Sequence, residues 1–266
     1  MVKGLYTAYT GMINEQKRLD VVANNLANAD TTGYKKEGAT SAAFEDQLAI
    51  RIKDSGTNFL PQRLGTVNMG VKIGETYTNY DQGSFEVTDN NSDIAIAGNG
   101  FFAIEFTDKQ GNTSIKYTRD GNFTVDREGY LVTADGNHVL NMNAALTSAQ
   151  GEAGYVRVDP LAEMSVDQTG QIYQNGQVID RIGYVDVADY NYLSKYGENL
   201  YDLEDGGQII ASDAQIEQGC LEASNVNVVD EMVSMITIQR AYEAGQKMIQ
   251  TEDDTLEMAV SQVGNV

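Results

Sequence analysis

The sequence between Asn225 and Val263 carries its most regular pattern, a line of apolar residues that recur every seven positions. The line consists of Val228, Met235, Tyr242, Ile249, Leu256 and Val263, and Met232, Ile236, Ile238, Met248, Ala259 and Val260 widen it. No proline interrupts the line, and Gly245 is its only glycine. A repeat of seven over this length predicts one long helix with a coiled-coil-like seam. The side-chain oxygens of Ser224 and Asn225 are placed to cap its first turn.

The amino-terminal residues carry a second stripe of the same period. It consists of Leu5, Met12, Leu19 and Leu26, with Tyr9, Val22 and Ala23 beside them. Asn24, Asn25 and Asn28 weaken this helix near its end, because asparagine side chains compete for backbone hydrogen bonds. A turn that closes at Gly33 then stops it. The two stripes predict helices that pack on each other, within one chain or between copies, since an isolated pair of helices is only marginally stable.

The middle of the chain has a different period. Residues 34–75 have a less clear pattern, in which Phe44, Leu48, Ile50 and Ile52 fit either a short helix or an extended arm. From Val71 to about Glu217, short alternating runs predict strands. Turns with positive φ are expected at Asp120-Gly121, Glu128-Gly129 and Asp135-Gly136. The segment from Tyr190 to Tyr201 is predicted to be an aromatic-rich loop.

Together these patterns predict an α+β fold. Long N- and C-terminal helices form a coiled-coil-like pair, and the centre is a mainly antiparallel β domain. The expected divisions are an N-terminal helix and turn at 1–33, a linker or extended arm at 34–75, the β domain at 76–218 and the C-terminal helix at 219–266. A chain of 266 residues is long enough for one large or two ordinary domains.

Composition disfavours several classes of function. A net charge of −21 argues against nucleic-acid binding, because phosphate contacts need clustered lysine and arginine side chains. The single cysteine, Cys220, has no partner for an internal disulfide or a zinc site, and we expect it to be a small buried residue. No apolar run reaches the roughly 18 residues that a membrane-spanning helix needs. The first residues also lack the features of a secretory signal, so these signals by themselves predict a cytosolic protein.

Candidate catalytic and metal-binding residues are isolated. His138 is the only histidine, and it follows a predicted turn with no second histidine or cysteine to complete a triad or a zinc site. The three acidic turns do not match the ligand spacing of a calcium loop, and turn chemistry explains their side chains. Gly98-Asn-Gly100 lacks the following helix that a phosphate-binding loop requires. We therefore predict no enzyme, no cofactor, no metal site and no small-molecule substrate.

Several longer motifs resemble those of bacterial flagellar rod and hook proteins. Asn24-Asn-Leu-Ala-Asn28, followed by Thr32-Gly33-Tyr34-Lys35, is similar to the amino-terminal signature of that family. The central motifs are similar at Gly98 to Phe102, Tyr117 to Phe123 and Gly197 to Tyr201, and the carboxy-terminal signature is similar at Ser224 to Ile236 and Gln239 to Glu243. The departures are small, with Gly245 where relatives often have asparagine and Ala223 where glycine or threonine is common. Length and central motifs look most like the distal rod branch, with the proximal rod branch as the nearest alternative.

The resemblance implies a structural subunit of the flagellar basal-body rod. Such a subunit polymerises helically into an axial tube that transmits torque from motor to hook during motility. Export by the flagellar type III apparatus without a cleaved signal is implied, so the expected location is the basal body in the cell envelope rather than the cytosol. The implied partners are other copies of the chain and other rod and hook proteins.

The resemblance also assigns roles to residues. The expected subunit-packing positions are Leu5, Met12, Leu19, Leu26, Val228, Met232, Met235, Tyr242, Ile249 and Leu256. The family-motif residues are Asn24, Asn25, Leu26, Asn28, Gly33, Gly98, Gly100, Asn225 and Arg240. Two alternatives stay open at this point: a secreted β-rich adhesion module with a helical stalk, and a peptidoglycan-cleaving enzyme, for which the chain has little room outside these motifs.

Overall fold

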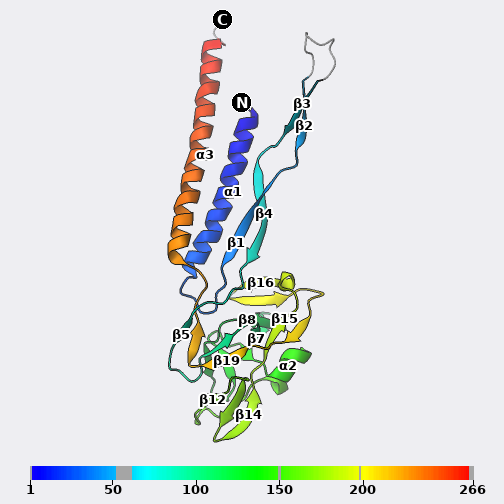
Figure 1. Cartoon of the computed structure of the whole chain (residues 1–266), viewed down its shortest axis with the longest axis vertical. Helices are drawn as coiled ribbons and strands as arrows, with labels where there is room; N and C mark the ends of the chain where they lie inside the picture. Colours follow the sequence, from blue (N-terminus) through cyan, green and yellow to red (C-terminus); the bar gives the residue numbers. More distant parts are fainter. Residues whose placement is uncertain (1, 52–61, 149–150, 198, 264–266) are drawn as a thin grey trace. The chain divides into compact units, whose positions relative to one another are not determined.

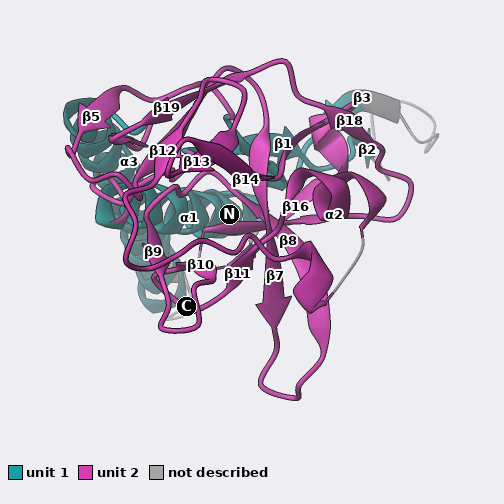
Figure 2. Cartoon of the chain, turned by 90° about the horizontal axis from the view of Figure 1, so that it is seen from below, with its two compact units in different colours: residues 1–27, 36–79, 226–266 teal, residues 28–35, 80–225 magenta. Residues whose placement is uncertain are grey.

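The computed structural model describes residues 2–51, 62–148, 151–197 and 199–263, and the chain divides into two compact units. Unit 1 comprises residues 1–27, 36–79 and 226–266, and unit 2 comprises residues 28–35 and 80–225 (Figure 2). The fold is α+β, with a helix at each end of the sequence and a β-rich centre, as predicted (Figure 1).

Unit 1 contains the two long helices, α1 (Val2–Ala27) and α3 (Val228–Val263), which lie side by side (Figure 1). Three contacts show that they run antiparallel. Asn25 reaches Glu231 at one end, Met12 lies against Gly245 in the middle, and Gly4 lies against Glu252 at the other end. The two residue numbers of each contact add up to nearly the same value, so the helices keep one register over this length.

Strands complete unit 1. Strand β1 (Glu37–Ala43) pairs antiparallel with β4 (Val71–Thr78), and β2 (Gln47–Arg51) pairs antiparallel with β3 (Gln62–Val67). Where they are described, residues 34–75 contain strands and no helix, so the short-helix alternative is wrong. The reason is that pairing in two strand ladders satisfies the backbone of this polar, weakly periodic stretch. Ile52 lies outside the described residues.

The start of α3 differs from the prediction. The helix begins at Val228, and its cap is Asn227, whose side-chain oxygen accepts hydrogen bonds from the amides of Val229 (3.0 Å) and Asp230 (3.4 Å). The side chain of Asn225 instead donates to the carbonyl of Asp81 at 3.0 Å. Cap identity was misassigned because any Ser or Asn before the stripe carries a suitable oxygen, and only backbone geometry selects among them.

Unit 2 is built on a nine-stranded antiparallel sheet. Its main path runs in the order β16-β17-β8-β7-β11-β10-β9, and outside this path β15 pairs with β7 and β18 pairs with β15. The strands are β7 (Phe101–Thr107), β8 (Thr113–Thr118), β9 (Phe123–Val125), β10 (Leu131–Thr133), β11 (His138–Val139), β15 (Tyr184–Val187), β16 (Leu193–Gly197), β17 (Leu200–Leu203) and β18 (Ile209–Ala211). All named pairings in it are antiparallel, as expected.

Smaller elements surround this sheet. They are a three-stranded sheet of β12 (Ser165–Val166), β13 (Gln171–Gln174) and β14 (Gln177–Arg181), the pair β6 (Ile94–Ala97) and β19 (Gln215–Gln218), the pair β5 (Phe85–Val87) and β20 (Cys220–Glu222), the helix α2 (Met142–Thr147), and two 3₁₀ turns at Glu152–Gly154 and Tyr190–Tyr192. The loop predicted for Tyr190 to Tyr201 is wrong, because this segment holds β16 and the start of β17. The burial of Leu193, Leu200 and Tyr201 pulls it into the sheet.

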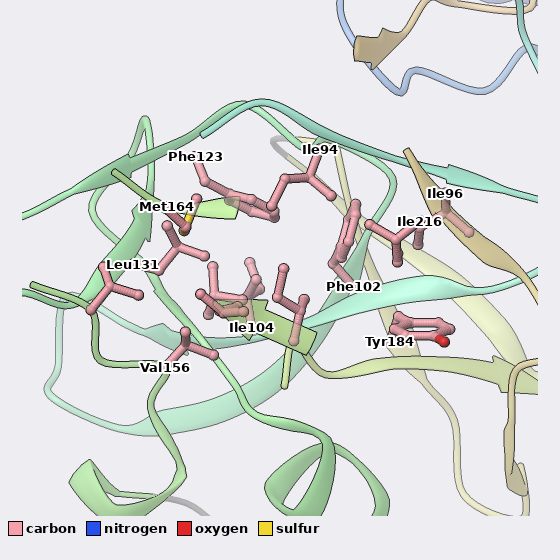
Figure 3. Packing of buried hydrophobic residues seen from close by; sticks show 14 of the residues in the cluster. Ile94, Ile96, Phe102, Ile104, Phe123, Leu131, Val156, Met164, Tyr184 and Ile216 are labelled. Carbon is pink, nitrogen blue, oxygen red and sulfur yellow. The ribbon is translucent and has the colours of Figure 1, made fainter. Parts of the chain in front are cut away.

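The core of unit 2 lies on both faces of β7. Phe102 and Ile104 face one hydrophobic cluster, in which Phe102 meets Phe123 edge to face with ring centroids 5.1 Å apart (Figure 3). Phe101 and Ala103 face a second cluster on the opposite side. A strand buried on both faces reads as a continuous apolar run, as this one does.

Two of the three predicted turns have the expected backbone. Gly129 and Gly136 both have φ of +86°, whereas Gly121 is not among the residues with positive φ. A side chain at Gly121 would collide with the carbonyl oxygen of Ile94. Glycine is required there by the close approach of another backbone, a reason that cannot be read from a local turn pattern.

Candidate functional site

The faces of α1 and α3 carry the residues predicted to pack subunits, and the inward face of α3 is narrower than its sequence stripe. Val228, Met235, Tyr242 and Ile249 are half-buried, whereas Leu256 is 39% exposed. Of the widening positions, Met232, Ile236, Met248 and Val260 are exposed by 49% to 73%. Only Ile238, at 4%, and the half-buried Ala259 belong to the inward face. Most of the residues expected to widen the seam are therefore exposed, and one of them, Met248, borders a groove beside α1.

A second line of seven-residue spacing completes that inward face. It consists of Glu231, Ile238, Gly245, Glu252 and Ala259, all buried or half-buried. A search for apolar residues misses it because two members are acidic and one is glycine. Gly245 marks a point of close helix approach, since a Cβ atom there would lie 2.6 Å from Cγ of Met12. The glycine therefore has a packing role.

On α1, too, only some of the residues predicted to pack subunits are buried against α3. Met12, Leu19 and Leu26 are half-buried, and Leu5 is 37% exposed. Small residues share the inward face, because Gly4, Ala8 and Gly11 are half-buried beside them. The α1–α3 contact is thus built from a few apolar side chains and several very small ones.

A buried polar cluster fixes the end of the helix pair where α1 stops. Glu231 is 2% exposed and Asn25 is 1% exposed. Lys36 Nζ lies 2.6 Å from one Glu231 carboxylate oxygen, and Asn25 Nδ2 donates to the other at 3.4 Å. Asn25 also exchanges two hydrogen bonds with the backbone of Glu37, at 2.8 and 2.9 Å. Because a buried polar group without a partner costs about 1–3 kcal/mol, this cluster favours one register of α1 against α3.

Two grooves run between the helices. One, of about 530 Å³, is lined by polar residues that include Glu15, Gln239, Glu243 and Gln246. The other, of about 540 Å³, is lined mainly by small or apolar residues, among them Gly4, Ala8, Gly11, Ala241, Ala244 and Met248. Glu252 also borders this second groove, and its Oε2 is shielded from solvent without a hydrogen-bond partner among the described residues.

The outward faces of both helices carry exposed apolar side chains. On α3 these are Val229 (68% exposed), Met232 (49%), Val233 (57%) and Ile236 (49%), which lie on one side at helical spacing. On α1 they are Tyr6 (57%), Tyr9 (53%) and Ile13 (37%). Contiguous exposed apolar residues on a helix are typical of surfaces that bind another protein.

In unit 2, the family motifs meet at a buried ion cluster. Lys35 Nζ lies 2.6 Å from Glu222 Oε1, and Arg119 Nη1 lies 3.1 Å from Glu222 Oε2, with all three side chains at most 3% exposed. Arg119 also donates to the carbonyl of Gly98 at 2.8 Å. Burial lowers the pKa of Lys35, an effect that the Glu222 carboxylate opposes. Glu222 was not among the predicted site residues, because residues 219–266 were assigned to the C-terminal helix, whereas Glu222 lies in strand β20.

Several motif residues around this cluster are constrained by backbone conformation and close approach. Gly33 has φ of +66°, and a side chain there would collide with the backbone of Arg119. Thr32, just before it, donates to Asp120 at 2.7 Å and accepts at its carbonyl from Asn199 at 2.7 Å. Gly100 has φ of +139°, and a Cβ atom there would lie 2.8 Å from the Ser212 hydroxyl. These motif residues shape the backbone of unit 2.

The remaining motif residues lie elsewhere. Asn24 is exposed, Asn28 is half-buried, and Arg240 is exposed on α3. The structure therefore brings Gly33 and Gly98 together around Arg119, while Asn25 belongs to the Glu231 cluster. No single site contains all the predicted motif positions.

Other side chains with possible chemistry are placed as follows. His138 stacks on Tyr155, with ring centroids 4.3 Å apart. Cys220 is a free thiol and is half-buried, less than the burial predicted for it. Within the described residues, no group of three or more His, Cys, Asp or Glu side chains is arranged to hold a metal ion. Nor is any described helix both long and apolar enough to cross a membrane.

Comparison with known families places the chain among flagellar rod and hook proteins. Residues 5–35 match the model of the flagella basal body rod protein, residues 95–174 match the D1 domain of the flagellar hook protein FlgE/F/G, and residues 217–262 match the C-terminal part of the flagellar basal body rod FlgEFG protein. The three matches contain the motifs quoted above, except the one from Gly197 to Tyr201.

Individual relatives agree over nearly the whole length. The flagellar basal-body rod protein FlgG of Bacillus subtilis is 33% identical over 98% of this chain and 99% of its own. FlgG of Borreliella burgdorferi is 35% identical over 97% of this chain and 98% of its own, and FlgF of Caulobacter vibrioides is 34% identical over the full length of both. The chain belongs to the flagellar basal-body rod protein family, a family of structural rod subunits of the flagellum rather than of enzymes.

Proposed function

We propose that this chain polymerises helically, with the terminal helices of many copies forming the wall of the axial tube that transmits torque from motor to hook. The observation that carries the proposal is the pair of outward apolar faces on α1 and α3, which one copy leaves exposed. In a polymer, these faces become buried between copies. Because a repeated contact between different patches does not close on itself, it generates a filament.

Within each copy, α1 and α3 form a coiled-coil-like pair. Support comes from the antiparallel register and from the two lines of seven-residue spacing on the inward face of α3. Leu5, Met232 and Leu256, which are exposed, are proposed to pack against neighbouring copies, whereas Met12, Leu19, Leu26, Val228, Met235, Tyr242 and Ile249 contribute to both contacts. We propose that the axial segments are the helical residues 1–27 and 226–266 within the predicted divisions 1–33 and 219–266, and that the central β domain, predicted at 76–218, corresponds to unit 2.

The remaining parts of the proposal rest on the family. The chain is exported by the flagellar type III apparatus, binds neighbouring rod and hook proteins, and is of the distal rod type, as its length and central motifs suggest. A second, similar rod gene beside this one would decide between the distal and proximal types.

Deletion tests the proposal. A chain lacking residues 2–27 loses α1 and should fail to form tubes or sheets in electron microscopy, while unit 2 keeps its β-type circular dichroism and its cooperative unfolding. A matched control leaves both helices intact and removes a similar number of residues, 44–68. Normal polymers from the chain without α1 would contradict the axial role of the helices.

The same experiment addresses the alternative of a secreted adhesion module. Such a module would remain a soluble monomer or a small closed oligomer at every concentration, with or without α1. Retention of that state by the intact chain, together with saturable binding to cell surfaces, would favour adhesion over rod assembly.

A further inference from the structure

One glycine of α1 has no explanation within its own chain. Gly11 lies in the middle of the helix, where glycine is less favourable than alanine. A Cβ atom at Gly4 would collide with Glu252, and one at Gly245 would press on Met12, but a Cβ atom at Gly11 would meet nothing within 4 Å. Gly11 lines the groove of small residues between α1 and α3.

The same groove holds an unsatisfied carboxylate. Glu252 Oε2 is shielded from solvent and has no hydrogen-bond partner among the described residues. Elsewhere in unit 1, the acidic side chain of Glu231 is matched by Lys36, and that of Glu15 by Arg18. A buried carboxylate oxygen without a donor is costly, so the groove lacks a positively charged or hydrogen-bond-donating group.

The line of exposed residues on the outward face of α3, called the outward stripe, carries side chains that complement this groove in size and charge. Val229, Val233 and Ile236 are large, apolar and exposed, and Arg240 continues the stripe one turn further on. Arg240 is exposed and has no ion pair within the part of the chain that the structure describes. The stripe therefore offers bulky side chains and a guanidinium that has no ion pair among the described residues, whereas the groove offers space and a carboxylate with one oxygen that lacks a hydrogen-bond donor.

We propose that the groove between α1 and α3 binds the outward α3 stripe of a second copy of this chain, with Arg240 of that copy paired to Glu252. This inference rests on the proposed function and names the contact through which copies join. Val229, Val233, Ile236 and Arg240 have the same spacing as Ala241, Gly245, Met248 and Glu252, with a constant offset of 12 positions. Parallel α3 helices displaced by about 18 Å along their axes, at about 1.5 Å per residue, bring each pair to the same level.

With that offset, the size of the stripe's side chains matches the space in the groove. Val233 reaches the level of Gly245, which lies across the groove from the Met12 region and so beside Gly11. The absence of a side chain at Gly11 leaves room for the branched side chain of Val233, much as small residues allow close helix approach elsewhere. The acidic last turns of α3, with Asp253, Asp254 and Glu257, are a poorer occupant because Glu252 would repel them.

Cysteine pairs in the full chain test the contact. In a Cys220→Ser background, Val229→Cys combined with Ala241→Cys should form a disulfide between copies during assembly and give a ladder of covalent oligomers. Within one helix these positions are about 18 Å apart, too far for an intrachain bond.

A control pair and a competing pair accompany this test. The control pair Val229→Cys with Lys247→Cys should yield at least tenfold less cross-linked oligomer, because Lys247 lies on the outward face. A ladder from Tyr9→Cys with Ala241→Cys, and none from the first pair, would show that α1 is the occupant and overturn the proposal.

Two further variants separate the proposal from a folding defect. Gly11→Leu should leave the monomer as stable as the parent, since its own chain leaves open space there, yet reduce the cross-linked ladder at least tenfold. Arg240→Glu should reduce assembly, and Arg240→Glu with Glu252→Arg should restore it. Normal polymers without the 229–241 cross-link, or with Gly11→Leu unaffected, would overturn this contact and leave the proposed function standing. Absence of any polymer from the parent chain would overturn both.

Discussion

Lys35 and Glu222 form a fully buried ion pair, with Nζ 2.6 Å from Oε1 and side-chain exposures of 1% and 0%. Arg119 shares the same carboxylate from its other oxygen, at 3.1 Å. One anion therefore balances two cations in unit 2. The pair joins Lys35, the last residue of the amino-terminal motif, to strand β20, which precedes α3 in the sequence.

Removal of the shared Glu222 carboxylate should strongly destabilise unit 2. Glu222→Ala leaves Lys35 and Arg119 buried without their counter-ion, and we expect a loss of about 3–5 kcal/mol in the free energy of unfolding. Urea unfolding followed by circular dichroism measures it. Glu86→Ala, an exposed position on the neighbouring strand β5, is the matched control and should change stability by less than about 0.5 kcal/mol. Equal effects of the two substitutions would mean that the ion cluster does not stabilise unit 2.

The helix glycines should respond in opposite ways to alanine. Gly11→Ala should stabilise the helix pair by about 0.5–1 kcal/mol, because helix propensity improves and the new methyl group meets open space. Gly245→Ala should lose that benefit or destabilise, since its Cβ atom would lie 2.6 Å from Met12 Cγ. Thermal unfolding of the two variants, side by side, measures the difference. The same sign for both would contradict the close approach at Gly245.

The inward face of α3 can be tested with a charge. Ile249 is half-buried on that face, and Ile249→Asp should destabilise the helix pair by about 1–3 kcal/mol and abolish rod assembly and motility. Gln250→Asp places the same charge on the next residue, which is exposed, and should be tolerated. Swimming assays and electron microscopy of basal bodies provide the readout. Motile cells carrying Ile249→Asp would rule out this face as the helix contact.

Asp120 gives a pH-dependent prediction. Burial raises the pKa of its carboxyl group, and hydrogen bonds from Thr32 and the Asn122 amide oppose that shift. With a folded-state pKa above the unfolded one, the charged carboxylate costs stability at neutral pH, and this cost disappears as pH falls below the ordinary range of aspartic acid. Asp120→Asn keeps an acceptor oxygen, so it should stabilise unit 2 at pH 7 and lose that advantage in acid. An advantage that grows with acidity would contradict this sign.

Three tyrosines should make unit 2 sensitive to alkali. Burial, as the largest cause, raises the pKa of Tyr117, Tyr155 and Tyr190 to about 12, and nearby carboxylates add to the effect. Because the folded-state pKa is raised, the stability contributed by the neutral phenols is complete below about pH 10 and is lost as pH rises toward 12. Phenolate absorbance and unfolding should therefore rise together over this range. If these three tyrosines formed phenolates near the ordinary tyrosine pKa while unit 2 stayed folded, their burial would be contradicted.

Much of the fold was predictable because periodicity reports local geometry. The seven-residue lines at Leu5 to Leu26 and Val228 to Val263 predicted two long helices, and the acidic-glycine turns predicted hairpins in the centre. Apolar pattern could not show that Glu231, Gly245 and Glu252 belong to the inward face of α3, since none of them is apolar. Nor could it separate the half-buried Met235 from the exposed Met232, which depend on where α1 lies.

The sequence was sufficient for the family, the element types at both ends and the antiparallel centre, because each depends on motifs or on spacing along the chain. Only the tertiary structure decided which side chains meet. Glu222 is the counter-ion of Lys35 and Arg119, and Asn227 caps α3. At Gly11, no neighbouring atom of the same chain requires a glycine. The physical cause is that burial and pairing are set by residues far apart in sequence, whose separation no local period records.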